Sequence, residues 1–217
     1  MSQEKISLKQ ADRIIFRTSF DDGLVDIFIS SVVLMFAVAP FLSRYLGDFW
    51  SSAVFLPIWG LLFIILRLIR VHVIKPRSGD VQFGPYRLRK LTVFSWIMLV
   101  VNIVFFILSF MVGYLLPLSS GLKTMLLFGA MVLALFSLAG YFLDVSRFYV
   151  YGLMLAAGPF IGEWLYQNFE VSHHGYPIVF GIYAAAIFLI GLIKLIKFLR
   201  DNPIPSEEQL QWETNNG

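Results

Sequence analysis

The sequence predicts an all-α integral membrane protein, a bundle of about six transmembrane helices with both termini on the cytoplasmic side (N-in/C-in). Two features of composition support this fold class. Hydrophobic residues make up 58% of the 217 residues and charged residues only 14%, whereas soluble domains contain about a quarter charged residues. The apolar residues also gather in long runs, which is typical of helices that cross a bilayer.

The apolar runs define the expected membrane domain, residues 24–199. Each run has at least 20 residues, enough to cross about 30 Å of hydrocarbon at a rise of about 1.5 Å per residue. The expected spans are 24–45, 50–71, 91–116, 122–143, 148–168 and 177–199.

The distribution of Lys and Arg predicts the orientation. Fifteen of the 17 basic residues fall on the side that holds both termini, and only Arg44 and Lys123 fall on the other. Basic residues accumulate on the cytoplasmic side of membrane proteins, so both termini and the 72–90 loop are expected there.

Three polar segments flank or interrupt the spans. Residues 1–23 carry Lys and Arg at every fourth position from 5 to 17, which predicts a basic amphipathic segment on the membrane surface, with a partly disordered tail as the alternative. In the cytoplasmic loop 72–90, Pro76–Gly79 lies between β-branched residues, and this pattern predicts a short β-hairpin-like turn. Residues 200–217 form a cytoplasmic tail.

Several functional classes lack support in the sequence. The chain has no cysteine, which excludes disulfides and thiolate chemistry. It shows no P-loop, no H-E-x-x-H and no Ser-His-Asp set. We therefore predict no catalytic, cofactor-binding or metal-binding residues and no nucleic-acid partner.

Polar residues within the spans are the candidates for an intramembrane site, because polarity is costly there. Glu163 lies in the fifth span, beside Gly162 and near Gly158-Pro159, and Tyr166 is its expected hydrogen-bond donor, with Tyr114 and Tyr45 as further donors. The alternative for Glu163 is solvation at the headgroups. Asn102 is expected to bond a neighbouring helix or contact a solute.

Other features have plainer interpretations. Asp144 and Arg147 flank one turn and are expected to form a local ion pair, and Asp26 lies one turn inside the first span. Gly158 and Gly162 form a small-xxx-small pair, which favours close helix packing over a transport site.

A basic cytoplasmic surface is the second candidate site. It contains Arg77, Arg87, Arg89 and Lys90, and such charges bind anionic lipids or an acidic partner. The alternative is that these residues only set the orientation.

Two short motifs resemble a known group of proteins. They are Asp22-Gly23-Leu24-Val25-Asp26-Ile27 and Pro76-Arg77-Ser78-Gly79-Asp80-Val81-Gln82-Phe83. Together they resemble an uncharacterised family of bacterial multi-pass inner-membrane proteins with D-G-L-x-D-I and P-R-x-G-x-V-x-F motifs. The resemblance implies a bacterial inner membrane and brings no activity with it.

Three functional classes follow. The first is a non-catalytic component that binds a protein partner, or a second copy, and helps in assembly. The second is a small-solute transporter or channel subunit, and the third is a membrane enzyme acting on lipid. We favour the first class, because no catalytic set and few charges lie at membrane depth.

Overall fold

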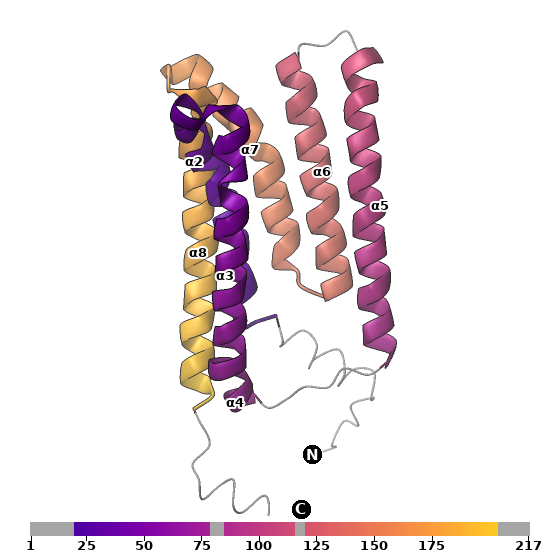
Figure 1. Cartoon of the computed structure of the whole chain (residues 1–217), viewed down its shortest axis with the longest axis vertical. Helices are drawn as coiled ribbons and strands as arrows, with labels where there is room; N and C mark the ends of the chain where they lie inside the picture. Colours follow the sequence, from indigo (N-terminus) through magenta and orange to yellow (C-terminus); the bar gives the residue numbers. More distant parts are fainter. Residues whose placement is uncertain (1–19, 79–84, 116–119, 204–217) are drawn as a thin grey trace, which may run out of the picture.

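The computed structural model describes residues 20–78, 85–115 and 120–203 and is all-helical in these ranges, with no strand. Six long helices run side by side (Figure 1). Their bounds are α2 Leu24–Ala53, α3 Phe55–Ile69, α5 Pro85–Leu115, α6 Ser120–Leu143, α7 Arg147–Phe169 and α8 Tyr176–Asp201.

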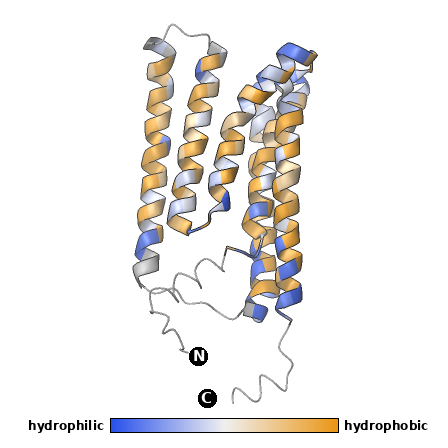
Figure 2. Cartoon of the chain, turned by 180° about the vertical axis from the view of Figure 1, so that it is seen from behind, coloured by the Kyte–Doolittle hydropathy of each residue, from blue (hydrophilic) through white to orange (hydrophobic). Residues whose placement is uncertain are grey.

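Five helical segments are long and apolar enough to cross a membrane, which confirms a multi-pass membrane protein. They are Leu24–Ala53, Phe55–Arg77, Arg89–Val112, Gly121–Leu143 and His173–Asp201. Hydrophobic residues predominate along these helices (Figure 2). The sixth long helix, α7, is less apolar than the others and is not among these five.

Helix α7 lies between α6 and α8. Its buried residues recur at three- and four-residue intervals and so form one stripe along the helix. These residues are Phe148, Tyr151, Gly152, Leu155, Gly158, Pro159 and Gly162. Gly152 packs on Phe136 of α6 and Gly158 on Phe180 of α8, whereas other residues of α7, such as Leu153, remain exposed.

The glycines of α7 permit this close packing. A Cβ at Gly158 would lie 2.9 Å from the Phe180 ring of α8, and one at Gly162 would lie 2.7 Å from the backbone oxygen of His174. These contacts agree with the packing interpretation of the small-xxx-small pair. The core continues through Phe36 and Phe128, whose rings lie 5.3 Å apart.

The helices form an open row, because α3 packs mainly on α2 and α5 packs mainly on α6. Large apolar side chains remain exposed along both flanking helices, among them Leu61 and Phe106. None of the most apolar stretch of α5 is buried by the rest of the described chain. These flanks are therefore available to lipid or to other transmembrane helices.

Two helix boundaries differ from the bounds of the expected spans. The loop expected at 46–49 is part of α2, which runs to Ala53 through a kink at Gly47, where φ is 77° and ψ is 164°. Glycine tolerates this backbone conformation and other residues do not, so the chain turns without an extended loop. α5 begins at Pro85 rather than at residue 91, because proline suits the first turn of a helix.

The first half of the expected hairpin is also wrong. Arg70–Ile74 form a π-helical turn, and Lys75–Ser78 form the short helix α4. The preceding helix continues through these β-branched residues, which overrides their preference for a strand. The second half, 80–83, lies outside the described residues, as do 1–19 and 204–217, which hold the expected surface segment and tail.

Candidate functional site

One end of the bundle gathers six ionisable residues from four segments of the chain. We call this group the charge cluster and the end where α2 begins and α8 finishes the charged end. The charge cluster consists of Asp21, Asp22, Asp26, Arg70, Arg147 and Lys194. Sequence analysis did not predict this group as a site.

The first turn of α2 places the acidic residues. The Asp22 carboxylate accepts a hydrogen bond of 3.0 Å from the backbone N–H of Leu24. This N–H is one of those at a helix N-terminus that have no partner within the helix. Its second oxygen pairs with Arg70 at the end of α3. Asp22 therefore fixes both the start of α2 and its contact with the next helix.

Gly23 is required for the same geometry. Its φ is +79°, and a Cβ at this position would lie 2.1 Å from the backbone oxygen of Gly191 in α8. The two backbones approach so closely that only glycine fits. The D-G-L-x-D motif thus has a structural explanation, because Asp22 caps the helix, Gly23 permits contact with α8 and Asp26 enters the core.

Arg147, at the start of α7, is the centre of the charge cluster. Its Nε donates to Asp26 Oδ1 at 2.8 Å, and its Nη1 donates to Asp21 Oδ1 at 2.8 Å. A third nitrogen donates to the backbone oxygen of Phe20. Charge-assisted bonds of this length are among the strongest in proteins, so one guanidinium links α7 to the segment that begins α2.

Asp26 is the most deeply buried acid of the charge cluster, with none of its side chain exposed. Tyr151 of α7 donates its hydroxyl to the same Oδ1 at 3.2 Å. Asp26 Oδ2 has no hydrogen-bond partner within the described part of the chain. A buried carboxylate oxygen without a partner is costly, which marks this atom as a place for a water molecule.

Asp21 lies at the edge of the charge cluster and joins two cations. The same Oδ1 accepts from Arg147 and from Lys194 Nζ, both at 2.8 Å. Partial burial acts to raise the pKa of Asp21, but the hydrogen bond and charge of Lys194 and those of Arg147 outweigh it, so the pKa lies below its usual value. Asp21 is therefore ionised at neutral pH.

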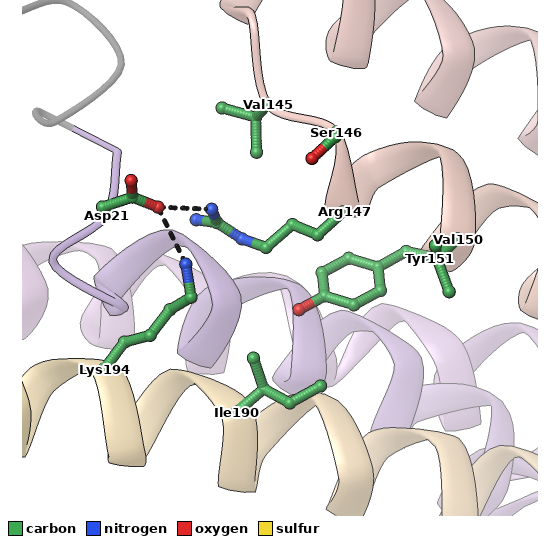
Figure 3. Close-up of a pocket in the computed structure, with 8 residues that line it drawn as sticks. All are labelled: Asp21, Val145, Ser146, Arg147, Val150, Tyr151, Ile190 and Lys194. Carbon is green, nitrogen blue, oxygen red and sulfur yellow. Dashed lines mark hydrogen bonds and ion pairs between the residues drawn. The ribbon is translucent and has the colours of Figure 1, made fainter. Parts of the chain in front are cut away.

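A pocket of about 280 Å³ opens beside these groups, between α7 and α8. Figure 3 shows Arg147 and Lys194 converging on Asp21, with Val145, Val150 and Ile190 around them. The pocket thus combines two cations, one acid and apolar walls. Such a combination binds a charged group; it does not by itself supply a nucleophile.

Metal ligation has little support in the described part of the chain. No group of three or more His, Asp or Glu side chains there is arranged to hold a metal ion.

Glu163 lies at the opposite end of α7. Its Oε2 is 2.9 Å from Nδ1 of His174, and its Oε1 accepts from Gln167 at 3.0 Å. Tyr166, the expected donor, instead stacks its ring near His174, at 4.5 Å between centroids. Tyr114 is 96% exposed. Sequence analysis did not identify His174 as a partner of Glu163.

Asn102 is exposed near the middle of α5, where burial against a neighbouring helix was expected. Its amide N–H bonds to the backbone oxygen of Met98, one turn earlier in the same helix, at 2.8 Å. Beside it lies a groove of about 530 Å³ between α5 and α6. Ser109 and Thr124 contribute further polar atoms to this groove.

The four residues of the expected basic surface are divided between different environments. Arg77 donates to the backbone oxygens of Leu199 and Asn202 at 3.1 and 3.5 Å and so caps the C-terminal end of α8. Lys90 pairs with Asp144 at 3.4 Å. Arg89 is exposed, and the side chain of Arg87 lies outside the described residues.

The expected local pair between Asp144 and Arg147 is replaced by two longer-range pairs. Asp144 bonds to Lys90 of α5, whereas Arg147 bonds to Asp21 and Asp26. Asp144 has a φ of 56° and ends α6, which turns its carboxylate toward α5. A signal was present in the sequence, because Asp26 and Arg147 both lie at the cytoplasmic ends of their expected spans.

No protein-family model, no curated protein and no solved structure matches this chain.

Proposed function

We propose that this protein is a non-catalytic membrane component that assembles with a partner through a transmembrane surface on α5 and α6. The observation that supports this proposal is the exposure of Asn102 within a long apolar helix. Asn102 lies close to the centre of the apolar segment Arg89–Val112. Polar residues at this depth usually face protein or water rather than lipid.

The amide of Asn102 retains bonding capacity for a partner. A carboxamide offers two donors and an acceptor oxygen, and the bond to Met98 uses one donor. Within the described part of the chain the amide oxygen accepts no hydrogen bond. Asn, Ser and Thr hydrogen-bond across helices in membranes, where each such contact contributes about 0.6–2 kcal/mol.

The groove beside Asn102 fits the side chains of a further helix. It is lined by polar atoms of Asn102, Ser109 and Thr124 and by the aromatic rings of Phe105 and Phe106. Phe106 is 66% exposed. A partner helix with a Ser, Thr or Asn facing this groove can hydrogen-bond to the amide and cover the rings. Lipid tails can cover the rings but cannot hydrogen-bond to the amide.

Photocrosslinking in native membranes tests the assembly. A photoreactive residue at position 106 is expected to give a protein adduct of discrete mass, and Asn102→Leu is expected to abolish it. The same probe at Leu61, which is exposed on α3, provides the control that Asn102→Leu leaves unchanged. An adduct of twice the chain mass identifies a second copy, and any other mass identifies a different protein.

Two outcomes contradict the proposal. One is that position 106 crosslinks to lipid alone. The other is that an adduct forms equally well with Asn102→Leu, because the amide then has no part in the contact.

We further propose the bacterial inner membrane as the location, with the charged end facing the cytoplasm. The supporting observations are the resemblance of the two motifs and the position of the basic residues, since Arg70, Arg147 and Lys194 meet at one end. A reporter that works only in the cytoplasm should be active when fused after Gly217 and inactive when inserted at Ser119. Activity at Ser119 overturns the orientation.

A further inference from the structure

The pocket between α7 and α8 has a feature that the proposed assembly does not use. Its two cations, Arg147 and Lys194, share a single oxygen of Asp21, at 2.8 Å from each. Figure 3 shows both cations directed at this oxygen. An external carboxylate or phosphate oxygen in the same place would meet the same two donors.

Asp21 can leave this position at small structural cost. Its side chain is 44% exposed, and it precedes the first residue of α2. Asp26, by contrast, is fully buried and continues to hold Arg147 through Nε. Rotation of Asp21 away from the pocket therefore exposes Arg147 Nη1 and Lys194 Nζ while the contact between α2 and α7 persists.

The charge of the emptied site selects a monoanion. With Asp21 turned away, the remaining charges are minus one on Asp26 and plus one on each of Arg147 and Lys194, a net charge of plus one. A single negative charge neutralises this site. A phosphodiester carries one negative charge, and its two free oxygens can accept from both cations at once.

The walls of the pocket select a ligand with an apolar part. Val145, Val150 and Ile190 line it, and Val150 is 55% exposed on the outer face of α7. The pocket thus leads from two cations to an exposed apolar surface. Cations in such positions interact with headgroups at the membrane surface.

We propose that Arg147 and Lys194 bind the phosphodiester headgroup of an anionic phospholipid and that Asp21 competes with it for the same two donors. This site differs from the basic surface that the sequence suggested, because Arg77 and Lys90 are engaged in contacts within the chain. Lipid binding here is independent of the partner groove on α5 and α6.

The test measures retention of phosphatidylglycerol and phosphatidylethanolamine by the purified full-length protein, using native mass spectrometry in mild detergent. Lys194→Gln should reduce phosphatidylglycerol retention about fivefold, because one of the two cationic donors to the phosphodiester is lost. Lys197→Gln is the matched control, since Lys197 is exposed on the same helix. It should leave retention unchanged.

Asp21→Asn gives the more distinctive result. Removal of the competing carboxylate should increase phosphatidylglycerol retention several-fold, whereas a purely structural role for Asp21 predicts no increase. Thermal unfolding of each variant confirms that it is folded. Equal effects of Lys194→Gln and Lys197→Gln, or no gain with Asp21→Asn, overturn the proposal.

A final comparison separates a lipid from a free anion. Inorganic phosphate offers the same oxygens without acyl chains, so it should stabilise the protein less than phosphatidylglycerol at the same concentration. Equal stabilisation by both contradicts a lipid site.

Discussion

The two ends of α7 differ in how they hold their charged residues. At the charged end, Arg147 is 16% exposed and bonds to Asp26, whose side chain is fully buried. At the opposite end, Glu163 is 26% exposed and bonds to His174, which is 56% exposed. Both contacts are short, yet only the first is shielded from solvent. Burial and the number of partners distinguish a structural centre from a surface contact.

The two contacts also differ in how much stability is lost when one partner is removed. Removal of Arg147 leaves Asp26 as an uncompensated charge in the core, which is strongly destabilising. Removal of His174 leaves Glu163 bonded to Gln167 and near solvent, where ion pairs contribute little. The charged end should therefore control the stability of the whole bundle.

The largest expected effect is that of Arg147→Met. It should lower the free energy of unfolding by about 3–5 kcal/mol, because one partner of a buried ion pair is lost. Unfolding in mixed micelles with increasing denaturing detergent measures this change. Arg44→Met, at an exposed position, is the control and should change stability by less than about 0.5 kcal/mol. Similar stabilities for the two variants would remove the distinction between the ends.

Gly23→Ala should have the next largest effect. The new Cβ would overlap the Gly191 oxygen, and the φ of +79° is unfavourable for alanine. A loss of about 1–3 kcal/mol is expected from such overpacking. Gly60→Ala is the matched control, since nothing lies within 4 Å of a Cβ there. If both substitutions are tolerated equally, α2 and α8 do not make this close contact.

The sequence predicted the membrane class and the approximate position of most helices, because a long apolar run indicates a segment that lies in the bilayer. It did not predict how the helices pair. The contact between Asp26 and Arg147 joins residues 121 positions apart, and no local pattern specifies which helices become neighbours. Sequence analysis favoured Glu163 over Asp26 because it considered only how far each residue lies from the end of its own helix. Burial depends on the surrounding helices as well.

The smallest expected effect concerns Asp21 and pH. Because its pKa in the folded protein lies below the usual value of 3.8, its contribution to stability is present above that value and is lost as the pH falls through the lower, folded pKa. The melting temperature of wild type should exceed that of Asp21→Asn at pH 7, and the difference should decrease progressively as the pH falls below about 4. A difference that grows with acidity would contradict this sign.

Double-mutant cycles at the two ends of α7 test the central claim most directly. One cycle combines Asp26→Asn with Arg147→Met, and the other combines Glu163→Gln with His174→Asn, all measured at the same pH in the same micelles. We expect a coupling energy of about 2 kcal/mol or more for Asp26 and Arg147 and less than about 1 kcal/mol for Glu163 and His174. Equal coupling, or stronger coupling at the opposite end, would contradict the conclusion that the charged end organises the bundle.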